Sequence, residues 1–94
     1  MSSTESTESF DAERVAVVVA GIWAEVLGTE VIPEADFFLL GGHSLLATQM
    51  IARVERSLGV RLKLRHVLDH PELAAFTDLV AGLVQDADLS ASPA

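Results

Sequence analysis

Apolar residues recur at helical spacing in three segments of the chain: Asp11 to Leu27, Ser44 to Leu58, and the residues that follow Pro71. Steps of three and four place side chains on one face of an α-helix. The pattern therefore predicts three amphipathic helices packed around a common core. The residues on the predicted inward faces are Val15, Val19, Ile22 and Val26, then Ala47, Ile51, Val54 and Leu58, then Leu73, Phe76, Val80 and Leu83.

The residues that flank these segments are typical of helix ends. Ser44 is a favoured N-cap, because its side-chain oxygen can accept a hydrogen bond from a free N–H of the first turn. Gly28 and Gly59 follow the first two segments, where glycine commonly takes the left-handed conformation that ends a helix. Pro71 suits the first position of the last helix, because that position needs no N–H.

Two connections lack helical periodicity. The segment 28–43 contains Phe37 and Phe38, which are too apolar to remain in water, so we expect a long first loop that these rings attach to the core. The segment Val60–Arg65 alternates apolar and polar residues, as strands do. A single strand has no partner, so we expect an extended connection and then a short helix near His66–Asp69.

These elements predict an all-α fold, a small antiparallel four-helix bundle with three main helices, one short helix and a long first loop. The chain has 94 residues, which suits one domain. Both ends are polar and poor in large apolar residues. We therefore expect a flexible tail at 1–10, one domain at 11–85 and a second flexible tail at 86–94.

Composition and charge exclude several classes of function. The net charge of -8 argues against nucleic acid and anionic membranes as partners, since both attract clustered Lys and Arg. The chain has no cysteine, which excludes disulfides, thiolate zinc sites and cysteine catalysis. No apolar run reaches the ~20 residues of a membrane span, and the first residues do not resemble a signal peptide. We therefore expect a cytoplasmic protein.

Two local clusters allow a functional and a bland interpretation. Five of the 6 basic residues fall in 53–65, as either a solvated face or a partner-docking patch. His66 and His70 are four residues apart, as a helical metal pair would be. Pro71 shortens that helix and no third ligand is evident, so no metal site is predicted.

The most unusual local sequence is Gly41-Gly42-His43-Ser44-Leu45. Its bland interpretation is a glycine turn before a serine-capped helix, although Ala47 stands where a capping box has Glu or Gln. A serine hydrolase is disfavoured, because Leu46 replaces the second glycine of the Gly-x-Ser-x-Gly elbow.

The stretch Asp36–Leu45 resembles the core motif of peptidyl carrier proteins, the thiolation domains of nonribosomal peptide synthetases. That motif is an acidic residue, two aromatic residues, a variable residue and then Leu-Gly-Gly-His/Asp-Ser-Leu/Ile. The resemblance extends over about residues 11–84. Three positions depart from the family: Leu39, where the family is usually acidic, Leu68, where it often has Phe, and Glu72, where it often has Thr. The matching residues are Asp36, Phe37, Phe38, Leu40, Gly41, Gly42, His43, Ser44 and Leu45.

The resemblance implies an acyl-carrier-protein-like fold with no catalytic residues of its own. Ser44 would carry 4′-phosphopantetheine, transferred from coenzyme A by a phosphopantetheinyl transferase, and the terminal thiol would hold aminoacyl or peptidyl thioesters. Further partners would be adenylation, condensation, and thioesterase or tailoring enzymes, and the carrier itself would be a monomer. His43, where acyl carriers of fatty acid synthesis usually have Asp, favours a peptidyl carrier.

Two alternatives stay open at this point. One is an acyl carrier protein of polyketide or fatty acid type, and the other is an acidic helical docking module in which Ser44 is only a helix cap. The initial Met1 and the short polar ends favour a free-standing carrier over a piece of a larger synthetase. The residues expected to contact partners are Gly42, His43, Leu45 and Thr48 beside Ser44, and Lys63 and Val67 in the segment that resembles the family's third helix.

Overall fold

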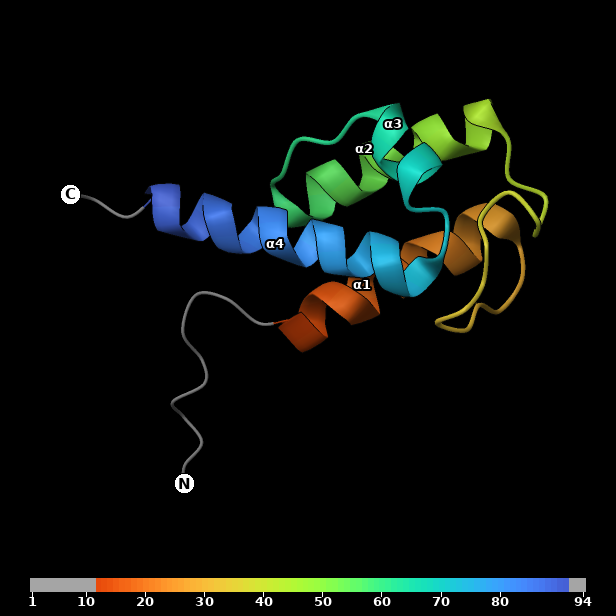
Figure 1. Cartoon of the computed structure of the whole chain (residues 1–94), viewed down its shortest axis with the longest axis horizontal. Helices are drawn as coiled ribbons and strands as arrows, with labels where there is room; N and C mark the ends of the chain where they lie inside the picture. The colour runs from red at the N-terminus through yellow and green to blue at the C-terminus, as the bar shows by residue number, and fades with distance from the viewer. Residues whose placement is uncertain (1–11, 92–94) are drawn as a thin grey trace, which may run out of the picture.

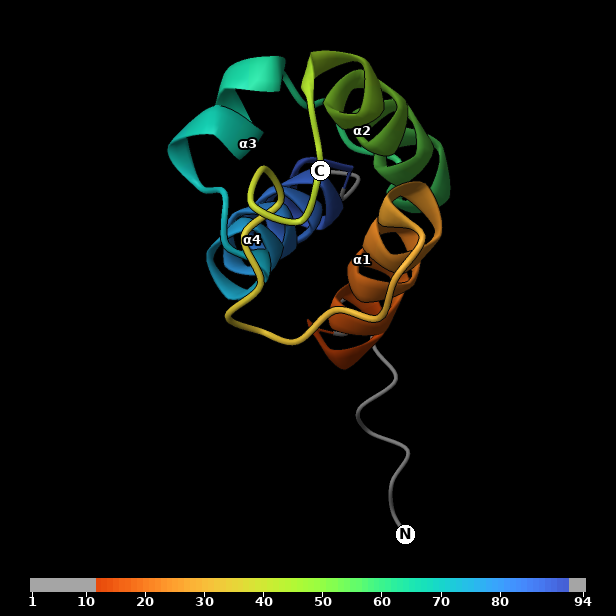
Figure 2. The ribbon, with the colours of Figure 1, turned by 90° about the vertical axis from the view of Figure 1, so that its right-hand side faces the viewer.

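The computed structural model describes residues 12–91, with side chains described up to Ala87; residues 1–11, which include the predicted N-terminal tail, and 92–94 lie outside the described residues. Among the described residues there are four α-helices and no strand. They are α1 (Ala12–Leu27), α2 (Ser44–Leu58), α3 (Leu64–Asp69) and α4 (Leu73–Ala91). Helix α1 runs opposite to α2 and α4, and the short α3 lies beside α2 (Figures 1 and 2). The predicted four-helix bundle is confirmed.

Three aromatic side chains form the centre of the core. Trp23, Phe37 and Phe76 are all fully buried. The ring centroid of Trp23 lies 5.1 Å from that of Phe37, edge to face, and 5.7 Å from that of Phe76. The first loop therefore supplies one of the three central rings. The predicted inward residues that are buried are Val15, Val19, Ile22, Ala47, Ile51, Val54, Leu73, Phe76 and Val80, whereas Val26, Leu58 and Leu83 are half-buried.

The first loop is attached to the start of α4 by backbone hydrogen bonds. Donor first, these bonds are Phe37–Pro71 at 2.8 Å, Leu73–Ala35 at 2.8 Å and Ala74–Pro33 at 2.9 Å. Between them, Asp36 and Glu72 form an isolated antiparallel bridge. Phe37 is fully buried and Phe38 is half-buried, so the expectation that these rings hold the loop to the core is confirmed.

Helix α4 differs from the sequence prediction at both ends. It begins at Leu73 and not at Pro71, because the backbone at 71–72 is extended and bonded to the first loop. It also continues to Ala91, past residue 86, where we expected a flexible tail. From Gln85 to Ala91 the sequence contains no Gly or Pro, so nothing interrupts the helical hydrogen bonds there. Polarity alone was therefore a poor guide to this end of the helix.

The connection between α2 and α3 is extended at 60–63, as the alternation that starts at Val60 predicted, but Leu64 and Arg65 already belong to α3, which starts two residues before the predicted His66. Val60 and Leu62 are buried, and the Leu62 N–H donates to the Glu55 carboxylate at 2.8 Å. Helix α3 then begins at Leu64. The apolar residues of this segment thus face the core without a sheet.

Candidate functional site

The first loop ends in a tightly bonded turn before α2. One carboxylate oxygen of Asp36 accepts the N–H groups of Phe38 at 2.9 Å and Leu39 at 3.0 Å. The Asp36 carbonyl also accepts the N–H of Leu40 at 3.1 Å. Asp36 therefore organises the turn through both its side chain and its backbone.

Glycine is required at both positions of the motif, but for different structural reasons. Gly41 has a φ of 102°, which side-chain-bearing residues rarely adopt. A Cβ at Gly42 would lie 2.3 Å from the ring of Phe37, so no side chain fits there. The half-buried Gly42, predicted to contact partners, is thus also needed for the close packing of the loop.

Ser44 is the first residue of α2 and not its N-cap. The N-cap is His43, whose backbone is extended, and its carbonyl accepts the first helical bond from the Ala47 N–H at 2.8 Å. The Ser44 side chain is exposed, and its hydroxyl has no hydrogen-bond partner within the described part of the chain. The prediction that Ser44 caps the helix is therefore wrong, because the loop places the cap one residue earlier.

Most predicted contact residues lie on the surface near Ser44. His43, Leu45 and Thr48 are exposed, and the Thr48 hydroxyl donates to the Ser44 carbonyl at 2.9 Å. Lys63 is exposed and immediately precedes α3. These residues are accessible to a partner, and their contact roles remain predictions.

Val67 is fully buried and cannot contact a partner directly, so its predicted role is wrong. Leu64 and Val67 are three residues apart on α3, which places both on its inward side. The exposed apolar residue of α3 is instead Leu68, which is 53% exposed. The three-residue spacing between Leu64 and Val67 was the sequence signal that could have identified Val67 as the buried residue and Leu68 as the exposed one.

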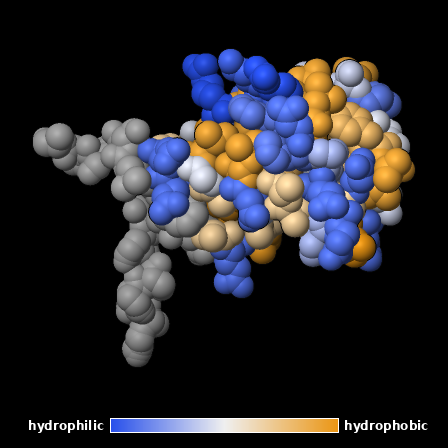
Figure 3. All heavy atoms as spheres, viewed as in Figure 1, coloured by the Kyte–Doolittle hydropathy of each residue, from blue (hydrophilic) through white to orange (hydrophobic). Residues whose placement is uncertain are grey.

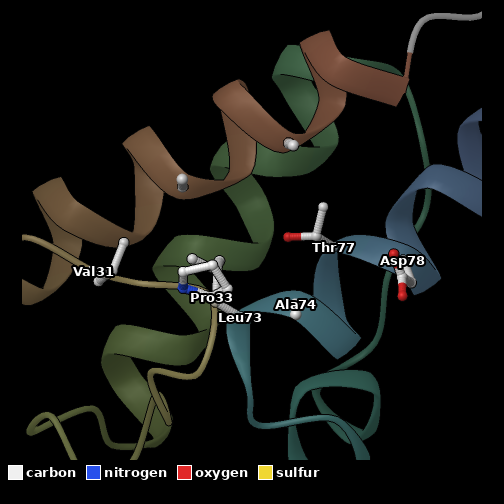
Figure 4. A pocket seen from close by; sticks show the side chains of 8 residues that line it. Val31, Pro33, Leu73, Ala74, Thr77 and Asp78 are labelled. Carbon is white, nitrogen blue, oxygen red and sulfur yellow. The ribbon is translucent and has the colours of Figure 1, made fainter.

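Ser44 lies exposed at the surface and does not line the recess of the molecule. A recess of about 340 Å³ opens instead between α1, the first loop and the start of α4, where Pro33, Ala74 and Thr77 are among the lining side chains (Figure 4). None of its lining residues is Ser44 or a predicted contact residue. The exposed position of Ser44 therefore suits the attachment and presentation of a group at the surface.

The two histidines of α3 and its C-cap make local backbone contacts. Nδ1 of His66 accepts the Lys63 N–H at 3.0 Å, and Nδ1 of His70 lies 3.2 Å from the His66 carbonyl, to which it donates when protonated. No group of three or more His, Cys, Asp or Glu that could hold a metal ion occurs in the described range. No helix between residues 12 and 91 has the length and apolarity to cross a membrane.

Solved structures with a similar arrangement of helices include acyl and peptidyl carrier proteins. One is BlmI, a type-II acyl-carrier-protein from Streptomyces verticillus involved in bleomycin biosynthesis (TM-score 0.71, 36% identity, 76% of this chain and 87% of that one). Another contains a peptidyl carrier protein in complex with the phosphopantetheine transferase Sfp and coenzyme A (TM-score 0.68, 36% identity, 72% of this chain and 90% of that one). The site and fold thus define a carrier.

The sequence also identifies the family. The profile of the phosphopantetheine attachment site family matches residues 17–80, and the chain belongs to that family, whose members carry 4′-phosphopantetheine. One of the subunits of linear gramicidin synthase from Brevibacillus parabrevis is 41% identical over 85 residues, which are 87% of this chain. Malpinin synthetase from Mortierella alpina is 41% identical over 91 residues, which are 92% of this chain. The chain spans only 1% of the length of either relative.

Proposed function

We propose that this protein is a peptidyl carrier protein that bears 4′-phosphopantetheine on Ser44 and holds aminoacyl or peptidyl groups as thioesters. The observation that carries the proposal is the exposed Ser44 hydroxyl, without a hydrogen-bond partner within residues 12–91, at the start of α2 inside the family match at 17–80. The relatives found among nonribosomal peptide synthetases favour peptidyl over fatty acyl cargo.

The residues around Ser44 fit a phosphodiester. The N–H groups of the first turn of α2 precede the first helical donor, Ala47, and the positive end of the helix dipole lies beside them. Exposure of the hydroxyl lets an enzyme reach it without local unfolding. The attached group would supply a flexible arm with a thiol at its end. The chain has no cysteine, so none of its own thiols competes for the acyl group.

The partners are proposed by the same reasoning. A phosphopantetheinyl transferase would modify Ser44, and adenylation, condensation, and thioesterase or tailoring enzymes would load and unload the thiol. The structure of Sfp with a peptidyl carrier protein supports the transferase as a partner. The adenylation–carrier structure of McyG with phenylalanyl-adenylate supports the adenylation enzyme. The free-standing state and the cytoplasmic location remain predictions.

The test is modification in vitro. The apo protein is incubated with coenzyme A and a transferase of broad specificity, and its intact mass is measured. We expect wild type to gain one phosphopantetheinyl group and Ser44→Ala to gain none. Ser57→Ala, at an exposed serine near the other end of α2, is the matched control and should be modified as wild type is. A wild-type protein that stays unmodified would refute the proposal.

The same variant separates the carrier from a docking module in which Ser44 is only a cap. Because His43 is the N-cap and the Ser44 hydroxyl makes no bond to the described residues, Ser44→Ala should change the free energy of unfolding by less than about 0.5 kcal/mol. A cap would lose about 0.5–2 kcal/mol. Urea unfolding followed by the fluorescence of Trp23, the chain's single tryptophan, measures this.

A further inference from the structure

The stretch of chain around Ser44 lacks charged residues and exposes apolar ones. No Asp, Glu, Lys or Arg occurs from Phe37 to Ala52, although 21% of the chain is charged. Leu39 is 85% exposed and Leu45 is 62% exposed, five residues before and one residue after Ser44. Figure 3 shows apolar surface at the right-hand end of the molecule, where Figure 1 places the first loop and the start of α2. Leu39, Leu40 and Leu45 thus lie within five residues of Ser44 in the chain, whereas the other exposed large apolar residues of the described part, Val17, Ile32 and Leu68, are more than ten residues from it.

Leu39 is held in place by the turn and does not hang from a loose loop. Its N–H is bonded to the Asp36 carboxylate at 3.0 Å, and the next N–H, that of Leu40, is bonded to the Asp36 carbonyl. Two residues before it, Phe37 is fully buried against Trp23. An apolar side chain on a fixed backbone loses little freedom when it is buried in a complex, so more of its burial contributes to binding.

An enzyme that acts at Ser44 has to cover this turn. Five residues of chain span at most about 18 Å, and the hydrogen bonds of the turn shorten that distance. A standard interface covers about 800 Å² on each partner, a patch about 30 Å across. Figure 2 shows the turn and the start of α2 at the same end of the molecule. Leu39 therefore lies within the footprint of a protein centred on Ser44.

Resting on the proposed carrier function, we infer that Leu39 is a docking residue. It enters, together with Leu45, an apolar recess beside the active site of the enzymes that act on Ser44. Because no Asp, Glu, Lys or Arg lies between Phe37 and Ala52, the contacts that this stretch makes with the enzyme are apolar and not ion pairs.

The experiment measures the kinetics of the same broad-specificity transferase at saturating coenzyme A. For Leu39→Ser we expect the KM for the carrier to rise at least about fivefold with little change in kcat, as for an anchor residue of an interface. Val17→Ser is the matched control, because Val17 is 67% exposed in the N-terminal half of α1, away from the turn. It should stay within about twofold of wild type. Leu39→Met keeps the apolar character and should recover most of the loss.

Salt and self-association complete the test. The ratio of Leu39→Ser to wild type should persist in about 0.5 M NaCl, where the Debye length is only a few ångströms, because apolar contacts are not screened. Equal kinetics for Leu39→Ser and Val17→Ser would overturn the inference while leaving Ser44 as the attachment site. A wild-type dimer in sedimentation that Leu39→Ser dissociates, with unchanged kinetics, would also overturn it in favour of a second copy of the chain. Unmodified wild type would instead refute the carrier function itself.

Discussion

At the scale of single residues, the site depends on a missing side chain. A Cβ at Gly42 would lie 2.3 Å from the ring of Phe37 and 2.6 Å from its carbonyl oxygen. Phe37 cannot retreat, because it is fully buried with its ring against Trp23. The glycine before His43 therefore fixes how closely the motif approaches the core, and this in turn fixes where α2 begins.

Gly42→Ala should lower the free energy of unfolding by about 1–3 kcal/mol, the usual effect of overpacking a core. Gly21→Ala is the control, since a Cβ at Gly21 meets nothing within 4 Å and the residue is exposed inside α1. That substitution should stabilise the protein by about 0.5–1 kcal/mol. Urea unfolding followed by Trp23 fluorescence compares the two. A Gly42→Ala protein as stable as wild type would contradict the packing argument.

At the scale of elements, the turn that precedes α2 depends on one carboxylate. Asp36 accepts the N–H groups of Phe38 and Leu39, and its neighbours on both sides are bonded to the start of α4. The turn is thus held by the hydrogen bonds of Asp36 within it and by the backbone hydrogen bonds to the α3–α4 junction. This double support explains why a loop without regular structure can hold a site in a defined position.

Asp36→Ala removes the acceptor of two N–H groups and should lower the free energy of unfolding by about 1–2 kcal/mol. Asp36→Asn keeps one side-chain carbonyl oxygen and should lose less. Amide hydrogen exchange of Phe38 and Leu39 measures the local effect, and we expect it to accelerate in Asp36→Ala while the amides of α1 stay protected. Unchanged exchange at both amides would show that the carboxylate does not order the turn.

The end of α4 tests where the folded unit stops. Gln85, Asp86 and Ala87 are helical but exposed. Removal of residues 86–94 should therefore lower the helical circular dichroism signal yet change the free energy of unfolding by less than about 1 kcal/mol. A chain ended after Thr77 loses the buried Val80 and should not fold. A large loss of stability on removal of residues 86–94 alone would show that these residues belong to the folded unit.

At the scale of the whole molecule, repulsion among the excess acidic side chains destabilises the compact folded state. The net charge is -8 in 94 residues, and self-repulsion in a compact state is screened by salt. Raising NaCl from about 0.02 M to about 0.3 M, which shortens the Debye length to less than about 10 Å, should therefore raise Tm. The double variant Glu34→Gln/Glu72→Gln, at two exposed acids, should show a smaller rise. Equal salt dependence in both proteins would exclude repulsion as the cause.

The sequence predicted the helix faces, which depend on a repeated spacing of apolar residues. It did not predict features that depend on a single contact. Helix spacing identified the inward residues of α1, α2 and α4, because each face is defined by four separate residues. The short α3 offers too few residues to fix its face, so Val67 was misplaced. The start of α4 depends on the loop bonds, which join residues 34 to 41 positions apart and leave no local pattern. The cap of α2 depends on the turn that Asp36 and Phe37 organise.

Backbone hydrogen bonds between 33–37 and 71–74 hold the two ends of the intervening segment together, so this segment forms a closed, non-covalent ring. That ring contains the whole of α2 and α3, including Ser44 and Leu68. Because the turn before Ser44 and helix α3 both belong to this ring, a substitution that breaks its closing hydrogen bonds is expected to disturb the two together.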